Sequence, residues 1–482
     1  MTPGLNNISP ENVRTPGLEV PGAGILAVSD PICREEKQLS WNRETVTVMP
    51  ASPVRRPAPT LDVCNVYFER IYDPTMHVVF VLDGAIDGEA MRAATVRLIG
   101  SDPYLRSRYT EVNDRPFWEE IPEERWNAGF VLADPDEDDP LTTPPPPLDL
   151  RSGPQVRVNL YRRSEGDVVA VTCHHGFCDA SGALTLARRV FAAYRGVMED
   201  PDFSPATTAP YDRGTGAILA LFPEEEQERA LAGEEPFIDR WRFPVERPGR
   251  GAPRFAYRTL TAGRLGRIKA FGREHDATVN DVLLGAYFLA LLESRSDPAD
   301  RGAPRSVLTS ADLRRRHPGI HGTGLPVNLS IAYEVTLSMG EGVRLADVVD
   351  RVAAITAERK AGDLGLASIL FYERIMAGGL PALQAFFDEM IERYLASGLK
   401  NPVFANLGIF APDDFLPIPG KNGTTLDLRD VQYLPCVCWP YGFLMIASTF
   451  RGRLTIGTAY EAGPYATATV ERFLEYVDTY LP

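Results

Sequence analysis

The sequence predicts two mixed α+β lobes that follow a loosely ordered N-terminal extension. Its 482 residues exceed the usual size of one domain. Strand-like and helix-like segments occur in both halves, which is typical of α+β folds or mixed α/β sandwich lobes. Between the halves, residues 196–240 are rich in Pro and acidic side chains and lack a strand pattern. We therefore expect an extension at 1–57, a first lobe at 58–215 and a second lobe at 216–482.

The first half opens with a predicted strand and helix. Residues 76–82 form a β-rich run that ends at the turn signal Asp83-Gly84. Asp87 then begins a helix, whose inward-facing candidates are Met91, Ala94, Val96 and Leu98. The prolines at 144–147 follow an acidic run and predict a surface loop, because proline has no N–H to donate to a sheet.

Two adjacent histidines lie where a predicted hairpin meets a predicted helix. Residues 155–162 and 168–173 have the pattern of two strands joined by a Ser-Glu-Gly-Asp turn. Apolar side chains then recur at helical spacing, on Leu184, Ala187, Val190, Phe191 and Tyr194. His174 and His175 thus follow a strand and precede a helix, where side chains can point into a cleft and backbone N–H groups remain free.

The second half repeats the mixture of strands and helices. A capping box at 278–281, with Asp in place of the usual Glu, precedes a long apolar helix at 282–292. A further helix is predicted near 345–358. Strands are predicted at 255–257, 306–309, 443–450 and 454–460.

Composition and charge narrow the classes of partner. Fifty basic against 65 acidic residues give a net charge of −15, which argues against nucleic acid or an anionic membrane as the main partner. The basic run 314–316 is a candidate for an anionic ligand such as a coenzyme A phosphate, or a solvated loop. No apolar run reaches the 18 residues of a membrane span. Six cysteines without a dense framework, and no secretory signal, predict a reducing cytoplasm.

The histidine pair is the strongest candidate for chemistry. Imidazole titrates near neutrality, so a histidine in a cleft can take a proton from an alcohol or an amine. Adjacent strand residues point to opposite sides, so only one of the two rings can face a given cleft. Three alternatives stay open: a zinc site with Cys173 and Cys178, two histidines that only satisfy the core, and Cys178 as a nucleophile.

The stretch from His174 to Ala180 resembles the His-His-x-x-x-Asp-Gly signature of the condensation-domain superfamily. That group includes nonribosomal peptide condensation domains, wax ester synthases, alcohol acetyltransferase-like proteins and polyketide-associated acyltransferases; chloramphenicol acetyltransferase is a more distant relative. Further similar stretches follow in the family's order, at 72–77, 103–108, 278–283, 312–314, 324–328 and 405–408. The resemblance covers about residues 60 to 480.

The resemblance implies two chloramphenicol acetyltransferase-like lobes that form a V with a central tunnel. It also implies that His175 is the base in direct attack of a hydroxyl or amine on a thioester, with His174 as a supporting residue. Asp179 would be a structural brace, for which Arg314 is the expected partner. Backbone N–H groups near Gly182 would help stabilise the oxyanion, and Asn328 would line the tunnel or have a structural role.

The implied activity is acyl transfer from coenzyme A or an acyl carrier protein, each a co-substrate, in specialised metabolism. No bound cofactor or metal is expected, and the protein is expected to be a monomer. The alternative is a protein of the same fold recruited to docking, cyclisation or epimerisation. One departure concerns Ala180, where the signature has Gly. If that residue needs a positive φ, Ala costs roughly 1 kcal/mol.

Overall fold

The computed structural model describes residues 53–482 except 134–138, 234–236, 296 and 363–364. The predicted extension lies outside the described residues apart from its last five, of which Arg55–Pro57 already form strand β1. Residues 53–482 form one compact unit. The predicted division of this unit after residue 215 stays a prediction.

A five-stranded sheet carries the histidine pair. Its strand order is β14-β2-β7-β6-β5, and all neighbours are antiparallel except the parallel pair β5 and β6. The predicted hairpin is confirmed as β6 and β7, and β7 ends at His174. The strands are β2 (Thr75–Leu82), β5 (Phe130–Leu132), β6 (Val156–Tyr161), β7 (Val168–His174) and β14 (Leu428–Leu434).

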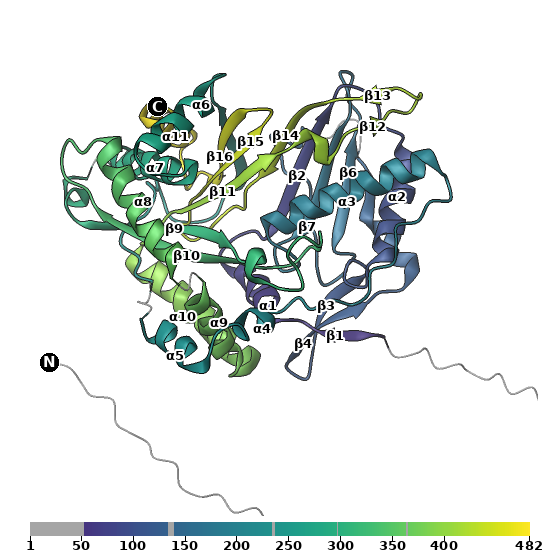
Figure 1. Cartoon of the computed structure of the whole chain (residues 1–482), viewed down its shortest axis with the longest axis horizontal. Helices are drawn as coiled ribbons and strands as arrows, with labels where there is room; N and C mark the ends of the chain where they lie inside the picture. The colour runs from purple at the N-terminus through teal and green to yellow at the C-terminus, as the bar shows by residue number, and fades with distance from the viewer. Residues whose placement is uncertain (1–52, 134–138, 234–236, 296, 363–364) are drawn as a thin grey trace, which may run out of the picture. The chain divides into compact units, whose positions relative to one another are not determined.

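Two helices pack together beside this sheet, α2 (Gly88–Ser101) and α3 (Ala180–Glu199), and α3 lies across its strands in Figure 1. The predicted apolar face of α3 is confirmed, because all five of its predicted members are buried. In α2, the predicted inward residues are buried except Val96, which is only half-buried. Thr95 and Ile99 are buried instead.

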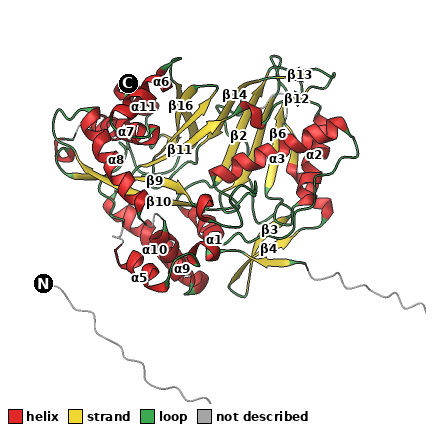
Figure 2. Ribbon diagram, in the orientation of Figure 1, coloured by secondary structure: helices red, strands yellow, loops and turns green. Residues whose placement is uncertain are grey.

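We call the five-stranded sheet with α2 and α3 the first layer. The second layer is built on a six-stranded sheet with the strand order β10-β9-β11-β15-β16-β8. Figure 2 shows helices gathered around this sheet. The strands are β8 (Ala252–Thr259), β9 (Pro304–Asp312), β10 (Ser330–Ser338), β11 (Val403–Phe410), β15 (Leu444–Phe450) and β16 (Arg453–Ala462). The helices are α6 (Arg264–Glu274), α7 (Val279–Arg295), α8 (Leu345–Ala361) and α11 (Thr467–Tyr480).

The predicted capping box at the start of α7 is confirmed. The backbone N–H of Thr278 donates to Asp281 Oδ2 at 2.8 Å, and that of Asp281 donates to Thr278 Oγ1 at 3.3 Å. The helix is buried from Asp281 to Leu292. Within the described residues, no single helix is long and apolar enough to span a membrane. Two helix pairs have the required length and apolar content when their two helices are counted together, but each pair is sharply bent.

The C-terminal part of the chain also contributes to the first layer, which is therefore not built from 58–215 alone. Strand β14 comes from the C-terminal quarter of the chain, yet it pairs with β2. The segment predicted as a linker also holds two helices, α4 (Gly216–Leu219) and α5 (Glu224–Gly233). The remaining elements are α1 (Thr60–Tyr67), α9 (Leu366–Met376), α10 (Gly379–Ser397), β3 (Ser107–Val112), β4 (Arg115–Glu120), β12 (Ile418–Pro419) and β13 (Thr425–Leu426).

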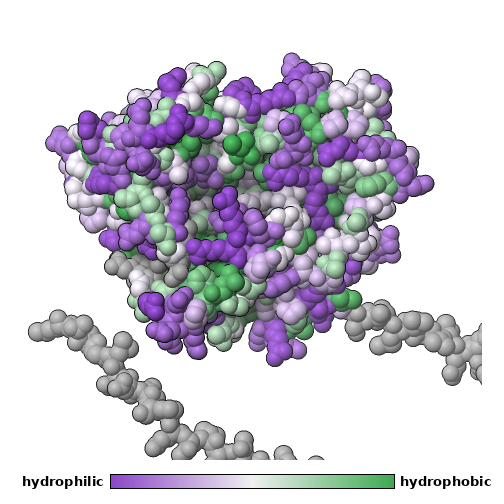
Figure 3. Space-filling view, in the orientation of Figure 1, coloured by the Kyte–Doolittle hydropathy of each residue, from purple (hydrophilic) through white to green (hydrophobic). Residues whose placement is uncertain are grey.

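The surface mixes charged and apolar side chains. On the face drawn in Figure 3, hydrophilic residues are widespread and small apolar patches lie between them. Isolated apolar residues on a surface are usual and need no partner. The predicted proline loop at 144–147 lies outside the strands and helices, as expected.

Candidate active site

The histidine pair lies in a tight turn between β7 and α3. The backbone N–H of His175 donates to the Pro74 carbonyl at 2.7 Å, which ties the turn to the start of β2. The N–H of Phe177 donates to the His174 carbonyl at 2.8 Å and reverses the chain direction. The turn is short, so Asp179 becomes the N-cap of α3.

The two imidazoles have different environments. His174 is 3% exposed, and its Nδ1 accepts the N–H of Gly176 at 2.9 Å. Burial lowers the pKa of His174 to about 3, so this ring stays neutral and fixed. His175 is only half-buried, although its Nδ1 is enclosed without a hydrogen-bond partner. Of the two histidines, His175 is therefore the more exposed.

Burial also lowers the pKa of His175, so the free imidazole dominates at neutral pH. Asp179, the backbone carbonyl of His175 itself and the Asn328 side chain oppose part of this effect. Neither the carbonyl nor Asn328 makes a hydrogen bond of normal geometry to Nδ1. The Tyr72 ring meets the His175 ring edge to face at 6.0 Å. A neutral imidazole with one apolar neighbour is suited to accept a proton.

Asp179 joins the turn to the second layer. Its Oδ1 accepts from Arg314 Nη2 at 2.6 Å, and its Oδ2 accepts from Arg314 Nη1 and from the Leu329 N–H, both at 2.9 Å. Burial alone would raise the pKa of Asp179, but Arg314 and the backbone donors outweigh it and hold that pKa below its ordinary value. The expected partner of Asp179 is thus present, as a bidentate pair.

Gly182 has a different role from the one expected. Its N–H donates to Asp179 Oδ1 at 3.0 Å as part of the helix cap, so it is not free to bind an oxyanion. A Cβ at this position would lie 2.6 Å from Cys178 Cβ and 3.2 Å from the Val327 carbonyl. Gly182 therefore permits close packing of the turn against the segment 326–329, which leads into β10.

Ala180 needs no special conformation. It is the first residue of α3, and its φ is not among the positive values of the described chain. The expected cost of replacing the signature's Gly with Ala is therefore absent. Ala is instead the most favourable helix former at this helical position.

A second ion pair anchors the opposite side of the turn. Arg213 Nε donates to Asp62 Oδ2 at 2.9 Å, and both side chains are almost completely buried. Arg213 Nη1 donates to the Pro326 carbonyl at 2.7 Å, and Nη2 donates to the Phe177 carbonyl. Asn328 Nδ2 donates to Asp62 Oδ1 at 2.9 Å. The segment 326–329 is thus held to the turn on both flanks.

The comparisons with solved structures concern the fold. Three solved structures overlay most of the chain. Polyketide synthase associated protein 5 from Mycobacterium tuberculosis has a TM-score of 0.60 and 19% identity, and the overlay covers 88% of this chain and 98% of that one. TRI3 trichothecene 15-O-acetyltransferase from Fusarium sporotrichioides has a TM-score of 0.64 and 14% identity, covering 89% and 95%. The epimerization domain of tyrocidine synthetase B has a TM-score of 0.61 and 15% identity, covering 89% and 96%.

This chain has the condensation-domain fold. Sequence relatives match shorter parts. Polyketide synthase PksN of Bacillus subtilis is 31% identical over 157 residues, which are 30% of this chain and 3% of the synthase. The phthiocerol/phthiodiolone dimycocerosyl transferase of Mycobacterium tuberculosis is 24% identical over 257 residues, 50% of this chain and 59% of the transferase. The chain thus matches less than two thirds of either relative's length. No protein-family model matches it.

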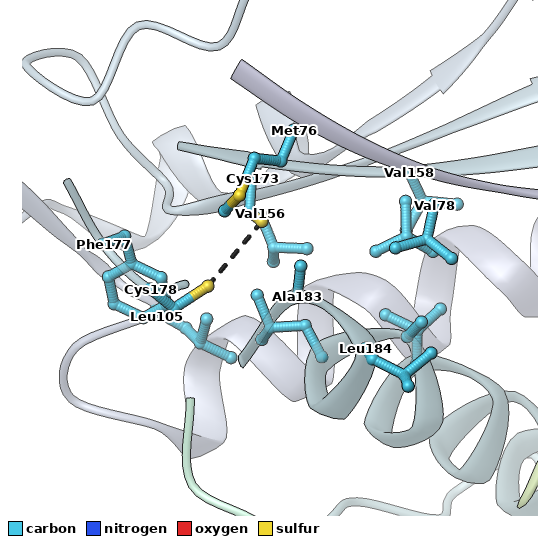
Figure 4. Packing of buried hydrophobic residues seen from close by; sticks show 14 of the residues in the cluster. Met76, Val78, Leu105, Val156, Val158, Cys173, Phe177, Cys178, Ala183 and Leu184 are labelled. Carbon is cyan, nitrogen blue, oxygen red and sulfur yellow. Dashed lines mark hydrogen bonds between the residues drawn. The ribbon is translucent and has the colours of Figure 1, made fainter. Parts of the chain in front are cut away.

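In this condensation fold, the cysteines beside the histidine pair are packed in the core. Figure 4 shows Cys173 and Cys178 facing each other among apolar side chains, with their sulfur atoms 3.7 Å apart. Burial raises the pKa of Cys178 well above its ordinary value, so its reactive thiolate is suppressed. Over the described part of the chain, no three His, Cys, Asp or Glu side chains are arranged to hold a metal ion.

The basic run 314–316 is not a free cationic patch. Arg314 is committed to Asp179 and also contacts Asp312 Oδ1 at 3.1 Å. Arg316 donates to the Gly362 carbonyl at 3.3 Å, and Arg315 is exposed. The Arg314 guanidinium is therefore part of the fold, and binding of a coenzyme A phosphate by this run stays a prediction.

The buried ion pair Asp62–Arg213 is not predicted from the sequence. One feature of the sequence could have indicated Asp62 as a buried carboxylate: it lies between Leu61 and Val63, and a single carboxylate in an apolar run is unusual. Arg213 has no such feature, because it lies in a Pro-rich stretch that has the composition of a linker.

Proposed function

We propose that this protein is an acyltransferase that moves an acyl group from a thioester of coenzyme A or an acyl carrier protein to a hydroxyl or amine acceptor. One observation carries the proposal: His175 is half-buried and held neutral in a turn that both layers fix. A fixed, neutral imidazole that remains accessible is the form that a general base requires.

The reaction needs no covalent intermediate on the protein. The acceptor oxygen or nitrogen attacks the thioester carbonyl carbon while His175 takes its proton. The tetrahedral intermediate then expels the thiolate, which receives that proton from the imidazolium. An ester or amide and a free thiol result. Cys178 takes no part, because burial suppresses its thiolate.

The relatives support this reaction class. The transferase relative carries the name phthiocerol/phthiodiolone dimycocerosyl transferase, and one neighbour of the same fold is named a 15-O-acetyltransferase. The synthase relative is named for polyketide assembly. We therefore place the proposed activity in specialised metabolite biosynthesis, where such acyl groups and acceptors are made.

A second candidate is proton transfer without acyl transfer. An epimerization domain shares this fold, and a histidine base can also remove a proton from the carbon next to a thioester carbonyl. The two reactions leave different products. Epimerisation would exchange that hydrogen with deuterated water and retain the thioester, whereas acyl transfer consumes it.

The test is acceptor-dependent thiol release. Purified protein is mixed with short, medium and long acyl-coenzyme A or acyl carrier protein and a panel of alcohols and amines. Free thiol is followed with a chromogenic disulfide, and the acylated products are identified by mass spectrometry. We expect thiol and acylated acceptor in equal amounts. Deuterium uptake into an intact thioester, without thiol release, would replace the proposal with epimerisation.

A further inference from the structure

Two buried polar atoms beside the turn have no hydrogen-bond partner. They are His175 Nδ1 and Asn328 Oδ1. A buried polar atom without a partner is rare and calls for an explanation. The two atoms are complementary if Nδ1 carries the ring hydrogen, since an amide oxygen only accepts. Asn328 lies against the turn, because its neighbours Val327 and Leu329 both hydrogen-bond to Asp179. Its side chain also contributes to raising the pKa of His175.

Asp62 fixes which way the Asn328 amide points. Asn328 is 1% exposed, and its Nδ2 donates to Asp62 Oδ1 at 2.9 Å. The reverse orientation would place the amide oxygen against a carboxylate oxygen, which is repulsive. The amide oxygen therefore points away from Asp62.

Asp62 is in turn held by donors only. Its Oδ2 accepts from Trp118 Nε1 and from Arg213 Nε, both at 2.9 Å. Burial raises the pKa of Asp62 above its ordinary value, and Arg213, Asn328 and Trp118 offset only part of this effect. Because each oxygen faces N–H donors and neither faces an acceptor, the carboxylate is the form that this site accommodates.

Arg213 completes the assembly. The side chain is 1% exposed, and its guanidinium lies over the rings of Phe177 and Tyr104, with centroid distances of 4.6 and 5.0 Å. It reaches α1 through Asp62, the turn through the Phe177 carbonyl and the second layer through the Pro326 carbonyl. One planar cation thus sets the relative positions of Asp62, the base and the segment that carries Asn328.

We propose that Asp62 and Arg213 are positioning residues for the base: they orient Asn328 so that its amide oxygen holds the hydrogen on Nδ1 of His175 and leaves Nε2 to accept the substrate proton. This inference rests on the proposed function for its kinetic consequence, but the tautomer itself is a property of the resting protein. Contacts of this kind often close fully only with substrate bound.

The predicted pH dependence follows from the groups around His175. Burial lowers its pKa, whereas Asp179, the backbone carbonyl of His175 itself and Asn328 raise it. Tyr72 is neutral because burial raises its own pKa. His174 is neutral as well. Removal of the Asn328 amide takes away a contribution that raises the pKa of His175. The acid limb of activity should therefore move to lower pH.

The experiment compares Asn328→Ala and Asp62→Asn with wild type. Asn328→Ala leaves the Asp62–Arg213 pair intact, so it serves if Asp62→Asn fails to fold. The matched control is Asp300→Asn, a buried carboxylate that pairs with Arg295 at 2.5 Å and Arg305 at 2.7 Å, outside the candidate site. The ring nitrogens of His175 are read by ¹⁵N chemical shifts, assigned with His175→Ala, and kcat/KM is measured against pH.

We expect the Nδ1–H tautomer in wild type and in the control. Both site variants should show a mixture of tautomers. Their kcat/KM should be roughly 10- to 100-fold lower, by analogy with the loss of groups that orient metal-binding histidines. A wild-type His175 with its hydrogen on Nε2 would overturn the inference. So would Asn328→Ala with an unchanged tautomer and pKa. Absence of thiol release in wild type would instead refute the proposed function and leave the tautomer measurement valid.

Discussion

Replacement of Asp179 by Asn tests the brace between the turn and the second layer. The carboxylate accepts from the Arg314 guanidinium twice and from the N–H groups of Gly182 and Leu329. Asn keeps one acceptor oxygen and remains a good N-cap, so the helix start is retained. What disappears is the anionic partner of a guanidinium that is 15% exposed.

The magnitude follows from that burial. Breaking a buried ion pair by removing one charge costs about 3–5 kcal/mol. The oxygen that Asn retains reduces this, and we expect about 2–4 kcal/mol. For a unit of the size of residues 53–482, the entropy of unfolding is about 0.9 kcal/mol/K. The expected fall in Tm is therefore about 2–4 °C.

The assay is calorimetric unfolding of Asp179→Asn beside the matched control Asp312→Asn. Asp312 contacts the same arginine, but its side chain is 44% exposed, and an exposed pair contributes about 0–1 kcal/mol. The pKa of Asp179 is lowered in the folded state, so its stabilisation is present above the ordinary carboxyl pKa and is lost as the pH falls through the folded value. Equal Tm values for the two variants at pH 7 would refute the brace.

Three further predictions concern single side chains. Gly182→Ala should lower the free energy of unfolding by about 1–3 kcal/mol, because its Cβ would overpack against Cys178. The control Gly266→Ala in α6, where the added Cβ meets nothing within 4 Å, should raise the free energy of unfolding by up to about 1 kcal/mol. Equal effects of the two variants in thermal unfolding would contradict the close packing at Gly182. Cys178→Ala should keep turnover within about threefold, because burial suppresses its thiolate; a loss as large as that of His175→Ala would indicate a covalent route. Burial lowers the pKa of Lys400 to about 8, so wild type should gain stability relative to Lys400→Met as the pH rises from 8 to 10; parallel curves in denaturant titrations would exclude this.

The elements near the histidine pair could be predicted because their patterns are local. The hairpin of β6 and β7 follows from two short strand-like runs on either side of a turn, and the apolar face of α3 follows from helical spacing. The cap of α7 follows from Thr278 and Asp281 alone. Such signals depend on neighbours in sequence, so one chain is enough to find them.

The contacts that complete the site depend on residues far apart in sequence. Asp62 and Arg213 are separated by 151 positions, and Asn328 lies a further 115 beyond Arg213. Strand β14 belongs to the first sheet, although strands of the second sheet both precede and follow it in the sequence. The use of the Gly182 N–H was missed for a different, local reason: it bonds to Asp179, three residues earlier, as the helix cap forms. No periodicity in the sequence reports such competition.

Turnover of His175→Ala tests the central claim most directly. The matched control is His275→Ala, since His275 pairs with Asp350 at 2.7 Å away from the turn between β7 and α3. With a thioester and an acceptor that wild type uses, we predict that His175→Ala loses roughly 10²–10⁴-fold in kcat, the usual contribution of a general base, while its Tm and the control's turnover stay near wild type. Full turnover by His175→Ala would show that His175 is not the base.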